Sequence, residues 1–453
     1  MQHSPVTVIG AGLAGSEAAW QLAERGVPVR LLEMRPGVTS PAHHGANMAE
    51  LVCSNSFKGM DTATAAGMLK RELDGMGSLL MDVARATAVP AGTALAVDRV
   101  AFSRAITQRL SSHPLVDVIR EEATALPEGD VIIATGPLTS AAFEPVLGSL
   151  VGEKRLAFFD AAAPIIDAAS IDRSVVFAAS RYGKGVGADY LNCPLDPDAY
   201  EALIDALISA RRVTSKDFET SDLFHACQPV EEIARRGREA LRFGALKPVG
   251  LTDPRTGQRP WAVVQLRSEN REGSAYNLVG FQTNLTFSEQ RAVFRTIPGL
   301  QSADFLRYGV MHRNTFVDAP RLLTSTLALR AHPRVRIAGQ LAGTEGYLEA
   351  AAGGLIAALD VAASRAGAHL SAVPRTTALG SLLAYASDSD VVDYQPMHVN
   401  LGLFPLLDAP IRNKDRRHAA FSDRAGRDFG DWLGTIPPAS PRTPESHGGG
   451  DVR

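Results

Sequence analysis

Cysteine is scarce in this chain of 453 residues, which contains only Cys53, Cys193 and Cys227. Three cysteines are too few, and odd in number, for a framework of disulfides. Their scarcity indicates a reducing compartment in which single thiols can take part in chemistry. The sequence therefore excludes the class of small disulfide-stapled secreted proteins.

The chain also lacks an excess of charge and a membrane-spanning segment. Its 46 lysines and arginines stand against 49 aspartates and glutamates, which leaves a net charge of −3. Any contact with nucleic acid must therefore come from a local basic patch. No uncharged apolar run is long enough to span a membrane, and no signal-peptide pattern precedes the first strand. We expect a cytoplasmic protein with no membrane partner.

Several catalytic and metal-binding motifs are missing as well. No cluster of histidine and cysteine has the spacing of metal ligands, and the pair His43-His44 is typical of a loop. There is no phosphate-loop lysine motif and no Gly-x-Ser-x-Gly elbow. We therefore expect no metal site and neither of these two kinds of active site.

What the sequence does contain is a glycine-rich turn between a short apolar strand and a helix. Gly10 allows a tight turn, Gly12 lets a pyrophosphate approach the backbone, and Gly15 lets the helix lie close to the strand. The first turn of the helix offers N–H groups and the positive end of its dipole to the phosphates. Glu33 ends the next strand, eighteen residues after Gly15, about where a ribose-binding carboxylate is expected.

These features predict a dinucleotide site. Its expected residues are Gly10, Ala11, Gly12, Leu13, Ala14, Gly15 and Glu33. The pattern alone does not separate NAD from FAD. Its position at the start of the sequence favours FAD by analogy, because many flavoproteins open in this way.

The order of apolar and polar segments predicts an α/β protein with a Rossmann-like FAD-binding domain and an inserted α+β domain. We expect the first part of the FAD-binding domain at 1–182, the insertion at 183–304, the return at 305–436 and a disordered tail at 437–453. The expected elements include helices at 63–86, 98–110 and 198–211, and strands at 130–134, 261–266, 276–282 and 335–340.

The return segment predicts a second contribution to the cofactor site. A strand ending at Gly339 and Gln340 is followed by a glycine turn at 343–346 and a helix at 347–365 that begins with Tyr347. Many flavoproteins with two dinucleotide folds place such a strand–turn–helix unit against the flavin. We therefore add Gly339, Gln340 and Tyr347 to the candidate cofactor-binding residues.

Two cysteines are candidate catalytic residues. Cys53 follows the ribose acid in a polar loop with His43, His44 and Lys58 nearby in sequence, and a cationic neighbour would favour its thiolate. The alternative for Cys53 is a buried small apolar residue. Cys227 precedes Pro229 and two acidic residues, a pattern typical of the start of a helix. A thiol just before a helix favours a thiolate, whereas Cys193 has no charged neighbours and is expected to pack.

A basic run follows Cys227. It consists of Arg235, Arg236, Arg238, Arg242, Lys247, Arg255 and Arg259. By itself the run is best explained as a solvated helix face. A reactive thiol beside it nonetheless fits an anionic polymeric substrate.

Taken together, the residues resemble the flavin- and folate-dependent tRNA uridine-5-methyltransferases, a bacterial family. The resemblance extends to about residue 420. Its most specific segments are the turn at 10–15 and the runs 41–44, 49–56, 178–182, 242–244, 247–251, 280–283, 308–314, 338–340 and 395–400. Ala226 departs from the glycine that the family carries before the second cysteine.

The resemblance implies FAD as the prosthetic group, methylenetetrahydrofolate as the carbon donor and NADH or NADPH as the reductant. It implies that the substrate is a uridine at position 54 in the T-loop of tRNA. It also implies Cys227 as the nucleophile that adds to uracil C6 and Cys53 as its partner nearer the flavin, although the two roles could be exchanged. Tyr347 and His312 are candidates for stacking on the flavin or pterin, with ordinary packing as the alternative.

Three other functions are compatible with parts of the pattern. A related flavoprotein that modifies the wobble uridine of tRNA shares the flavin, the folate and the opening fold, but is expected to have a longer helical C-terminal domain. A flavin-dependent NAD(P)H oxidoreductase without an RNA substrate would use the glycine turn and leave the cysteines unexplained. A non-catalytic RNA-binding flavoprotein would leave the paired thiols without a role.

Overall fold

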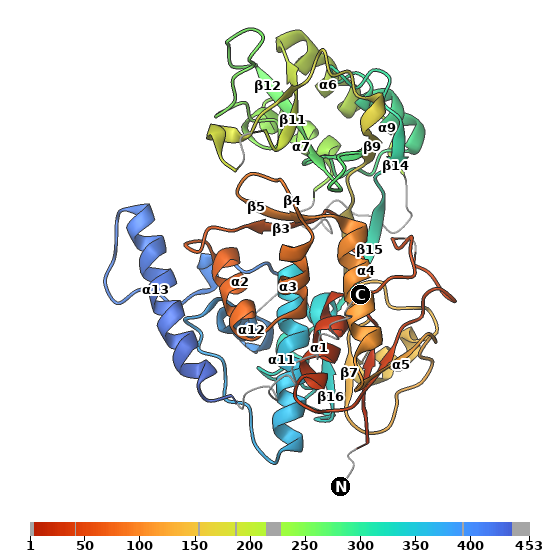
Figure 1. Cartoon of the computed structure of the whole chain (residues 1–453), viewed down its shortest axis with the longest axis vertical. Coiled ribbons are helices and arrows are strands. Elements are labelled where there is room, and N and C mark those ends of the chain that lie inside the picture. The colour runs from red at the N-terminus through yellow and green to blue at the C-terminus, as the bar shows by residue number, and fades with distance from the viewer. Residues whose placement is uncertain are drawn as a thin grey trace, which may run out of the picture.

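The computed structural model describes residues 4–40, 42–152, 155–185, 188–213, 228–391 and 394–436. Within these residues the chain forms two bodies that lie one above the other (Figure 1). The lower body combines the beginning and the end of the described chain, and the upper body consists of its middle. The tail predicted to be disordered, residues 437–453, lies outside the described residues.

The lower body is built on a five-stranded parallel sheet. Its strands, in spatial order, are β16 (Val335–Ile337), β7 (Val131–Ile133), β1 (Val6–Ile9), β2 (Val29–Leu32) and β6 (Val116–Ile119). In register, Thr7 faces Arg30 on one side and Val131 on the other. The carboxyl ends of β1, β2, β7 and β16 thus lie at one edge of the sheet, where ligands bind in open α/β sheets.

Helices surround this sheet. They are α1 (Leu13–Ala23), α2 (Ala65–Gly75), α3 (Leu79–Ala86), α4 (Arg99–Ser112), α5 (Glu144–Val151), α10 (Ala319–Leu322), α11 (Tyr347–Arg365), α12 (Ala378–Ser387) and α13 (Lys414–Leu433). Short 3₁₀ turns are η5 (Gly339–Ala342) and η6 (Leu401–Leu403). Helix α13 runs along the outer left side of the lower body in Figure 1.

The upper body is built on a six-stranded antiparallel sheet. Its strands, in spatial order, are β10 (Phe177–Ala178), β11 (Tyr190–Leu195), β12 (Ala262–Ser268), β13 (Ala275–Leu278), β9 (Ile165–Asp167) and β14 (Phe305–Arg307). Its helical elements are η1 (Ala168–Ser170), η2 (Arg181–Gly183), α6 (Pro197–Ser209), α7 (Val230–Arg236), α8 (Ala240–Phe243) and α9 (Phe287–Phe294).

Two small sheets lie where the bodies meet (Figure 1). One consists of β3 (Ser56–Gly59), β5 (Ala94–Val97) and β4 (Ala88–Val89), and the other of β8 (Arg155–Ala161) and β15 (Met311–Val317). The Asn55 side chain donates hydrogen bonds of 2.9 Å to the carbonyl oxygens of Val97 and Ser268, one in each body. The loop that carries Cys53 is therefore fixed between the two bodies.

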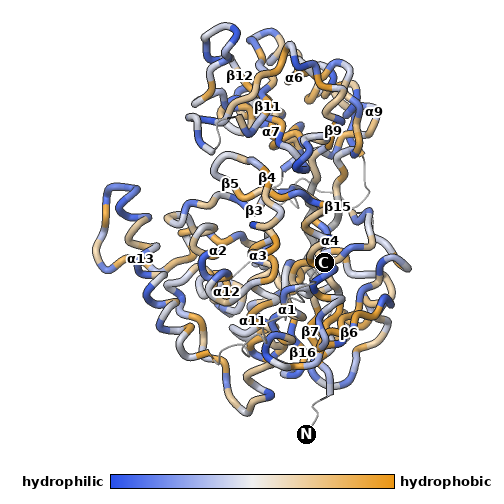
Figure 2. Tube along the Cα trace, in the orientation of Figure 1, coloured by the Kyte–Doolittle hydropathy of each residue, from blue (hydrophilic) through white to orange (hydrophobic). Residues whose placement is uncertain are grey.

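The apolar pattern explains both cores. Strands β1, β7 and β16 of the lower body are mostly apolar and buried along their whole length, as a sheet covered by helices requires, whereas β2 and β6 are only partly buried (Figure 2). Strand β12 is buried along its whole length in the upper body, although it carries Gln265 and Arg267. Each body thus has a core of its own, and Cys193 lies completely buried in the upper one. Burial raises the pKa of the Cys193 thiol far above its usual value, which agrees with a packing role.

The predicted fold class, a Rossmann-like α/β flavoprotein fold with an additional sheet, is confirmed. The single helix expected over 63–86 is divided into α2 and α3, because Gly77 adopts a positive φ and Ser78 caps the second helix. The boundaries of the insertion at 183 and 304 stay predictions; the second sheet itself runs from Ile165 to Arg307.

Candidate active site

The glycine turn leads from β1 into α1, and its three glycines meet different surroundings. Gly10 has a φ of +94°, and a Cβ there would lie 2.7 Å from the carbonyl oxygen of Ala134. A Cβ on Gly15 would overlap the carbonyl oxygen of Gly10, whereas a Cβ on Gly12 would meet no atom within 4 Å. The fold itself requires Gly10 and Gly15. Gly12 instead faces open space beside the first turn of α1, as a phosphate-binding turn should.

The return segment lies directly against this turn. A Cβ on Gly354 in α11 would overlap the carbonyl oxygen of Ala14 in α1, so the two helices touch backbone to backbone. Gly339 has a φ of +74°, and a Cβ there would lie 2.8 Å from the Cβ of Ala14. The small residues at 339 and 354 therefore bring the last strand and its helix to the opening βαβ unit.

A cavity opens at this edge of the sheet. Its walls include Gly10, Gly12, Leu13, Ala14, Glu33, Gly339, Gln340 and Tyr347. Of the other two residues expected at the cofactor, Ala11 is completely buried and donates its amide to Glu33, and Gly15 packs on Gly10. The structure thus brings residues from both ends of the chain together around one cavity.

Glu33 is held as a carboxylate at the wall of this cavity. One carboxylate oxygen accepts the Ala11 amide at 2.9 Å, and the other accepts the Arg35 Nε at 2.8 Å and the Arg35 amide at 3.0 Å. Burial opposes ionisation, but the hydrogen bond and charge of Arg35 outweigh it and lower the pKa of Glu33. A charged acceptor in this position can bind the hydroxyl groups of a ribose.

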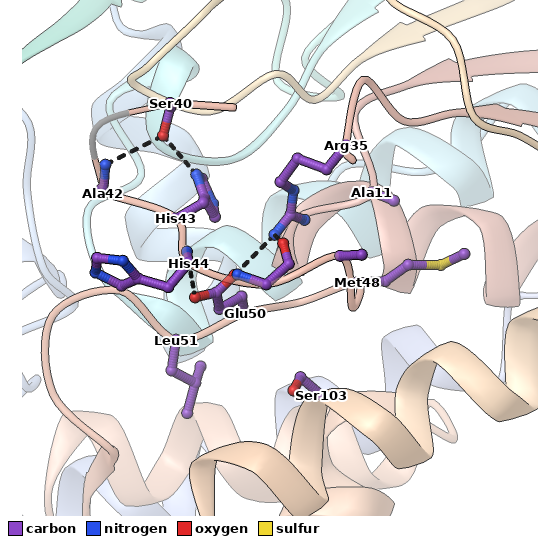
Figure 3. Close-up of polar contacts among 12 residues, drawn as sticks. Ala11, Arg35, Ser40, Ala42, His43, His44, Met48, Glu50, Leu51 and Ser103 are labelled. Atoms are coloured by element: carbon purple, nitrogen blue, oxygen red, sulfur yellow. Dashed lines mark hydrogen bonds and ion pairs between the residues drawn. The ribbon is translucent and has the colours of Figure 1, made fainter. Parts of the chain in front are cut away.

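The loop after β2 adds polar residues that sequence reasoning did not assign to the cofactor. Arg35 also donates a 2.9 Å hydrogen bond to Glu50, which in turn accepts the backbone amide of His44 (Figure 3). The His43 ring lies 2.6 Å from the Ser40 hydroxyl (Figure 3), and burial together with the charge of Arg35 lowers the pKa of His43 to about 4. His43 is therefore a neutral wall of the cavity near neutral pH. The composition of residues 35–59 had predicted a loop here, but not these contacts.

A second cavity lies beside the first. Both are lined by Val52, Pro137, Leu138, Gln340 and Tyr347, so the two cavities adjoin. The second cavity also reaches Cys53, Ser54 and Lys58. Two adjoining cavities between a phosphate turn and a thiol fit a dinucleotide with its reactive ring at the thiol end.

Cys53 lies partly exposed at this second cavity, in a loop held by three side chains. The Tyr347 hydroxyl accepts the Cys53 amide at 3.0 Å and donates to the Ser54 carbonyl oxygen at 2.8 Å. Arg307 donates to the Val52 carbonyl oxygen at 2.6 Å, and Arg99 contacts the Cys53 carbonyl oxygen at 3.4 Å. Two guanidinium groups thus bind the backbone on the loop that carries the thiol.

One of these two arginines, Arg99, is held in place by residues of the upper body. Arg99, at the start of α4, forms an ion pair with Glu269 at 2.8 Å, and Glu269 also accepts a hydrogen bond from Asn277. The charge of Arg99 and its hydrogen bond overcome the burial of Glu269 and lower the pKa of that carboxyl. This buried contact ties Cys53 to the upper sheet, and nothing in the local sequence predicted it.

Tyr347 has features of both roles expected for it, namely stacking on the flavin or pterin and ordinary packing. Its ring lines both cavities and lies 5.6 Å from the ring of Phe57, while its hydroxyl bonds the backbone beside Cys53. Burial raises the pKa of the Tyr347 phenol, so it remains neutral. Tyr347 therefore organises the Cys53 loop, and stacking on a bound ring stays a prediction. The side chain of His312 lies outside the described part of the chain.

Lys58, Glu349 and His398 form another polar group at the second cavity. The Lys58 ammonium lies 2.7 Å from a carboxylate oxygen of Glu349 and 3.1 Å from Nδ1 of His398. Glu349 is completely buried in α11, and burial followed by the charge of Lys58 lowers the pKa of His398. Lys58 is separated in sequence from Glu349 by 291 positions and from His398 by 340. Sequence reasoning had no signal that would join them.

Cys227 lies outside the described residues, which resume at Gln228. Pro229 directly precedes α7, and Glu231 and Glu232 occupy its first turn, as the sequence predicted. Glu231 is buried and accepts the amide of Asn284 at 2.7 Å and the hydroxyl of Thr283 at 2.9 Å. The start of α7 is therefore anchored to the upper body, and the segment that ends with Cys227 leads into it.

Two further findings concern metal ligands and helices of membrane-spanning length. Among the described residues, no group of three or more His, Cys, Asp or Glu side chains could hold a metal ion. One described helix, α11, is long and apolar enough to cross a membrane, but 72 % of its apolar window is buried inside the protein. Its packing against α1 explains that composition without a membrane.

Comparisons with known proteins find a matching family and several similar relatives. The family described as glucose inhibited division protein A matches residues 5–369. The chain is 55 % identical over 432 residues to the methylenetetrahydrofolate–tRNA-(uracil-5-)-methyltransferase TrmFO of Geobacter sulfurreducens, covering 95 % of this chain and 99 % of the relative. It is 53 % identical over 454 residues to the protein of the same name from Pelobacter propionicus, covering 100 % and 99 %.

A solved structure shares the fold. The structure of GidA from Aquifex aeolicus superposes with a TM-score of 0.68 at 16 % sequence identity, covering 95 % of this chain and 74 % of that chain. An identity this low supports a common fold and no finer statement.

Proposed function

Because this chain belongs to the glucose inhibited division protein A family, and within it to the TrmFO methyltransferases, we propose that its joined cavities form the site where FAD meets tRNA. The chain is a tRNA (uracil-5-)-methyltransferase that depends on FAD and takes its carbon from methylenetetrahydrofolate. The proposal extends this activity to uridine 54 of the T-loop, to NADH or NADPH as the reductant and to the cytoplasm as the location.

The observation that carries the proposal is the pair of adjoining cavities between the glycine turn and Cys53. A dinucleotide with its pyrophosphate at Gly12 and its ribose at Glu33 would extend along these cavities toward Tyr347. Gly10, Gly15 and Gly339 allow the backbone to close around it, and Ala11, Leu13, Ala14 and Gln340 complete its walls. When bound, FAD supplies the electrons and carries the one-carbon unit for transfer.

Two thiols supply the chemistry that the chain itself contributes. Uracil C5 is a poor nucleophile until a group adds at C6, and a thiolate adding there makes C5 enolate-like. We assign this addition to Cys227 and removal of the C5 proton to Cys53. Tyr347, Arg99 and Arg307 support Cys53 by fixing the carbonyl and amide groups of its loop. The target base must leave its stack to react, so the two bodies must also bind the RNA around that base.

Trapping with RNA that contains 5-fluorouracil tests the assignment of the two cysteines. The fluorine at C5 cannot leave as a proton, so a covalent protein–RNA adduct should accumulate with the unmodified protein. We expect Cys227→Ala to abolish the adduct and Cys53→Ala to retain it. An adduct that survives Cys227→Ala and disappears in Cys53→Ala would reverse the roles. Cys193→Ala is the matched control, because Cys193 is buried in the upper core.

The reaction product tests the substrate. Mass analysis of tRNA nucleosides, after incubation with methylenetetrahydrofolate and NADH or NADPH, should find 5-methyluridine in the T-loop. An aminomethyl product at the wobble position would instead support the related flavoprotein activity. Oxidation of the nicotinamide without any RNA product would support an oxidoreductase without an RNA substrate.

A further inference from the structure

A third hollow lies in the upper body at the end of β11 and β12. Tyr190 pairs with Arg267 at one end of these strands, and Leu195 pairs with Ala262 at the other. The first end touches the lower body, because Tyr190 donates a 2.9 Å hydrogen bond to Ala91 there. The hollow is at the second end, one strand length away, which is roughly 17 Å.

Two aromatic rings form part of the hollow. Phe243, at the end of α8, is 74 % exposed, and Trp261 precedes β12. The guanidinium of Arg242 lies 3.6 Å from the centre of the Trp261 ring and 5.7 Å from the centre of the Phe243 ring. Arg242 is held there by a hydrogen bond to the Trp261 carbonyl oxygen and an ion pair with Glu239. The result is a fixed platform of two rings and one planar cation, a surface on which a nucleobase can stack.

The charges around the platform are unequally neutralised. Most arginines of the basic run form ion pairs inside the upper body, for example Arg235 with Glu232 and Arg238 with Asp205. In contrast, Lys247 and Arg259 line the hollow, are exposed and form no ion pair within the described part of the chain.

The two carboxylates in the wall do not neutralise these cations. Asp253 is bound by Arg255 through two hydrogen bonds, of 2.7 and 3.0 Å, and Asp196 caps the first turn of α6. The hollow therefore presents exposed cations beside exposed rings. That combination complements a phosphate backbone with an unstacked base.

We propose that this hollow is a second RNA site, which binds an unstacked base of the tRNA substrate and its neighbouring phosphates at a point remote from the methylated uridine. The inference rests on the proposed function, because it takes tRNA as the occupant. Phe243 stacks on the base, Trp261 and Arg242 support it, and Lys247 and Arg259 bind the phosphates. An acidic protein segment would use the two cations but would gain little from the exposed rings.

Equilibrium binding of full-length tRNA transcript tests the site. Phe243→Ala should weaken binding by roughly 10-fold, since stacking on one aromatic ring is worth about 1–3 kcal/mol. The double variant Lys247→Ala/Arg259→Ala should reduce the slope of log affinity against log salt by about 1.5, because two phosphate contacts are lost. Both variants should raise KM for tRNA and leave kcat and KM for methylenetetrahydrofolate unchanged.

Matched controls come from the same body. Phe287 in α9 is 53 % exposed but lies outside the hollow, and Arg211 is exposed and paired with Glu289. Phe287→Ala and Arg211→Ala should bind tRNA as the unmodified protein does. A short hairpin containing only the T-arm should bind all of these proteins equally, because it cannot reach both sites.

The outcomes separate this inference from the proposed function. Full-length tRNA bound with unchanged affinity and unchanged salt slope by both hollow variants would overturn the second site, even if the unmodified protein makes 5-methyluridine. Equal losses on the hairpin and on full-length tRNA would also overturn it, because the hollow would then contact the target arm. Selective weakening on full-length tRNA without any methylated product would support the hollow and refute the proposed function.

Discussion

Replacing Gly12 with alanine tests whether the open space beside α1 belongs to the cofactor. Gly12 has a φ of −70° and a ψ of −167°, which alanine adopts without strain, and the added Cβ would meet no protein atom within 4 Å. Alanine restricts the unfolded chain, which stabilises by about 0.4–1 kcal/mol, but it is a poorer N-cap than glycine. These effects offset each other, so the free energy of unfolding of the flavin-free protein should change by less than about 0.5 kcal/mol.

The effect on FAD should be much larger. A methyl group at this position occupies the space through which the pyrophosphate must approach the backbone amides. Loss of one hydrogen bond to a charged phosphate costs about 1.5–3 kcal/mol, which corresponds to an increase in Kd of about 10- to 150-fold. We therefore expect Gly12→Ala to fold normally and to lose most of its flavin during purification.

The assay compares thermal unfolding of the flavin-free proteins with titration of each by FAD, followed through flavin fluorescence. Gly15→Ala is the matched control, because its Cβ would overlap the carbonyl oxygen of Gly10 and should destabilise the protein even without flavin. If Gly12→Ala bound FAD within about two-fold of the unmodified protein, the pyrophosphate could not lie at this turn. The assignment of the first cavity would then be wrong.

Three further predictions concern stability, pH and the Cys53 loop. Gly354→Ala should lower the free energy of unfolding by about 1–3 kcal/mol, because its Cβ would overlap a carbonyl oxygen of α1. Gly430→Ala is the control, because a Cβ there would meet no atom within 4 Å, and it should raise the free energy of unfolding by about 0.5–1 kcal/mol. Chemical denaturation in which both variants changed the free energy of unfolding in the same direction would contradict this prediction. Burial raises the pKa of Glu72 from 4.5 to about 7, so the folded protein keeps a proton that the unfolded chain releases above about pH 4.5. The free energy of unfolding should therefore fall by about 3 kcal/mol between pH 4.5 and 7, and denaturation curves of Glu72→Gln should lack this component. Tyr347→Phe should retain FAD but slow single-turnover methylation, because the hydroxyl that holds the Cys53 loop is lost; an unchanged rate would show that this contact is dispensable.

Much of the architecture could be predicted from local patterns. The helix at 347–365 lies where the sequence placed it, and the strand expected at 335–340 begins at Val335 but ends at Ile337, because runs of apolar residues and turn glycines act over a few neighbouring positions. The division of the helix expected at 63–86 was missed. There the apolar period continues through Gly77, and only the backbone conformation reveals the break.

The surroundings of Cys53 could not be predicted in the same way. Arg99 and Glu269 are separated by 170 positions, and Lys58 and Glu349 by 291. Their side chains meet only because the upper sheet, α4 and α11 converge on one loop. Each of these residues taken alone is an ordinary charged residue that the sequence would place in solvent.

The sequence by itself determined the glycine turn, the acid that ends the second strand and the two candidate thiols, because each depends on the spacing of a few adjacent residues. Tertiary structure alone decided that segments far apart in the sequence line two adjoining cavities, the second of which reaches Cys53. It also decided which cations are neutralised and which remain exposed beside Phe243. The physical reason is that hydrogen bonds and ion pairs form between groups that packing brings together, and distance along the chain does not record that packing.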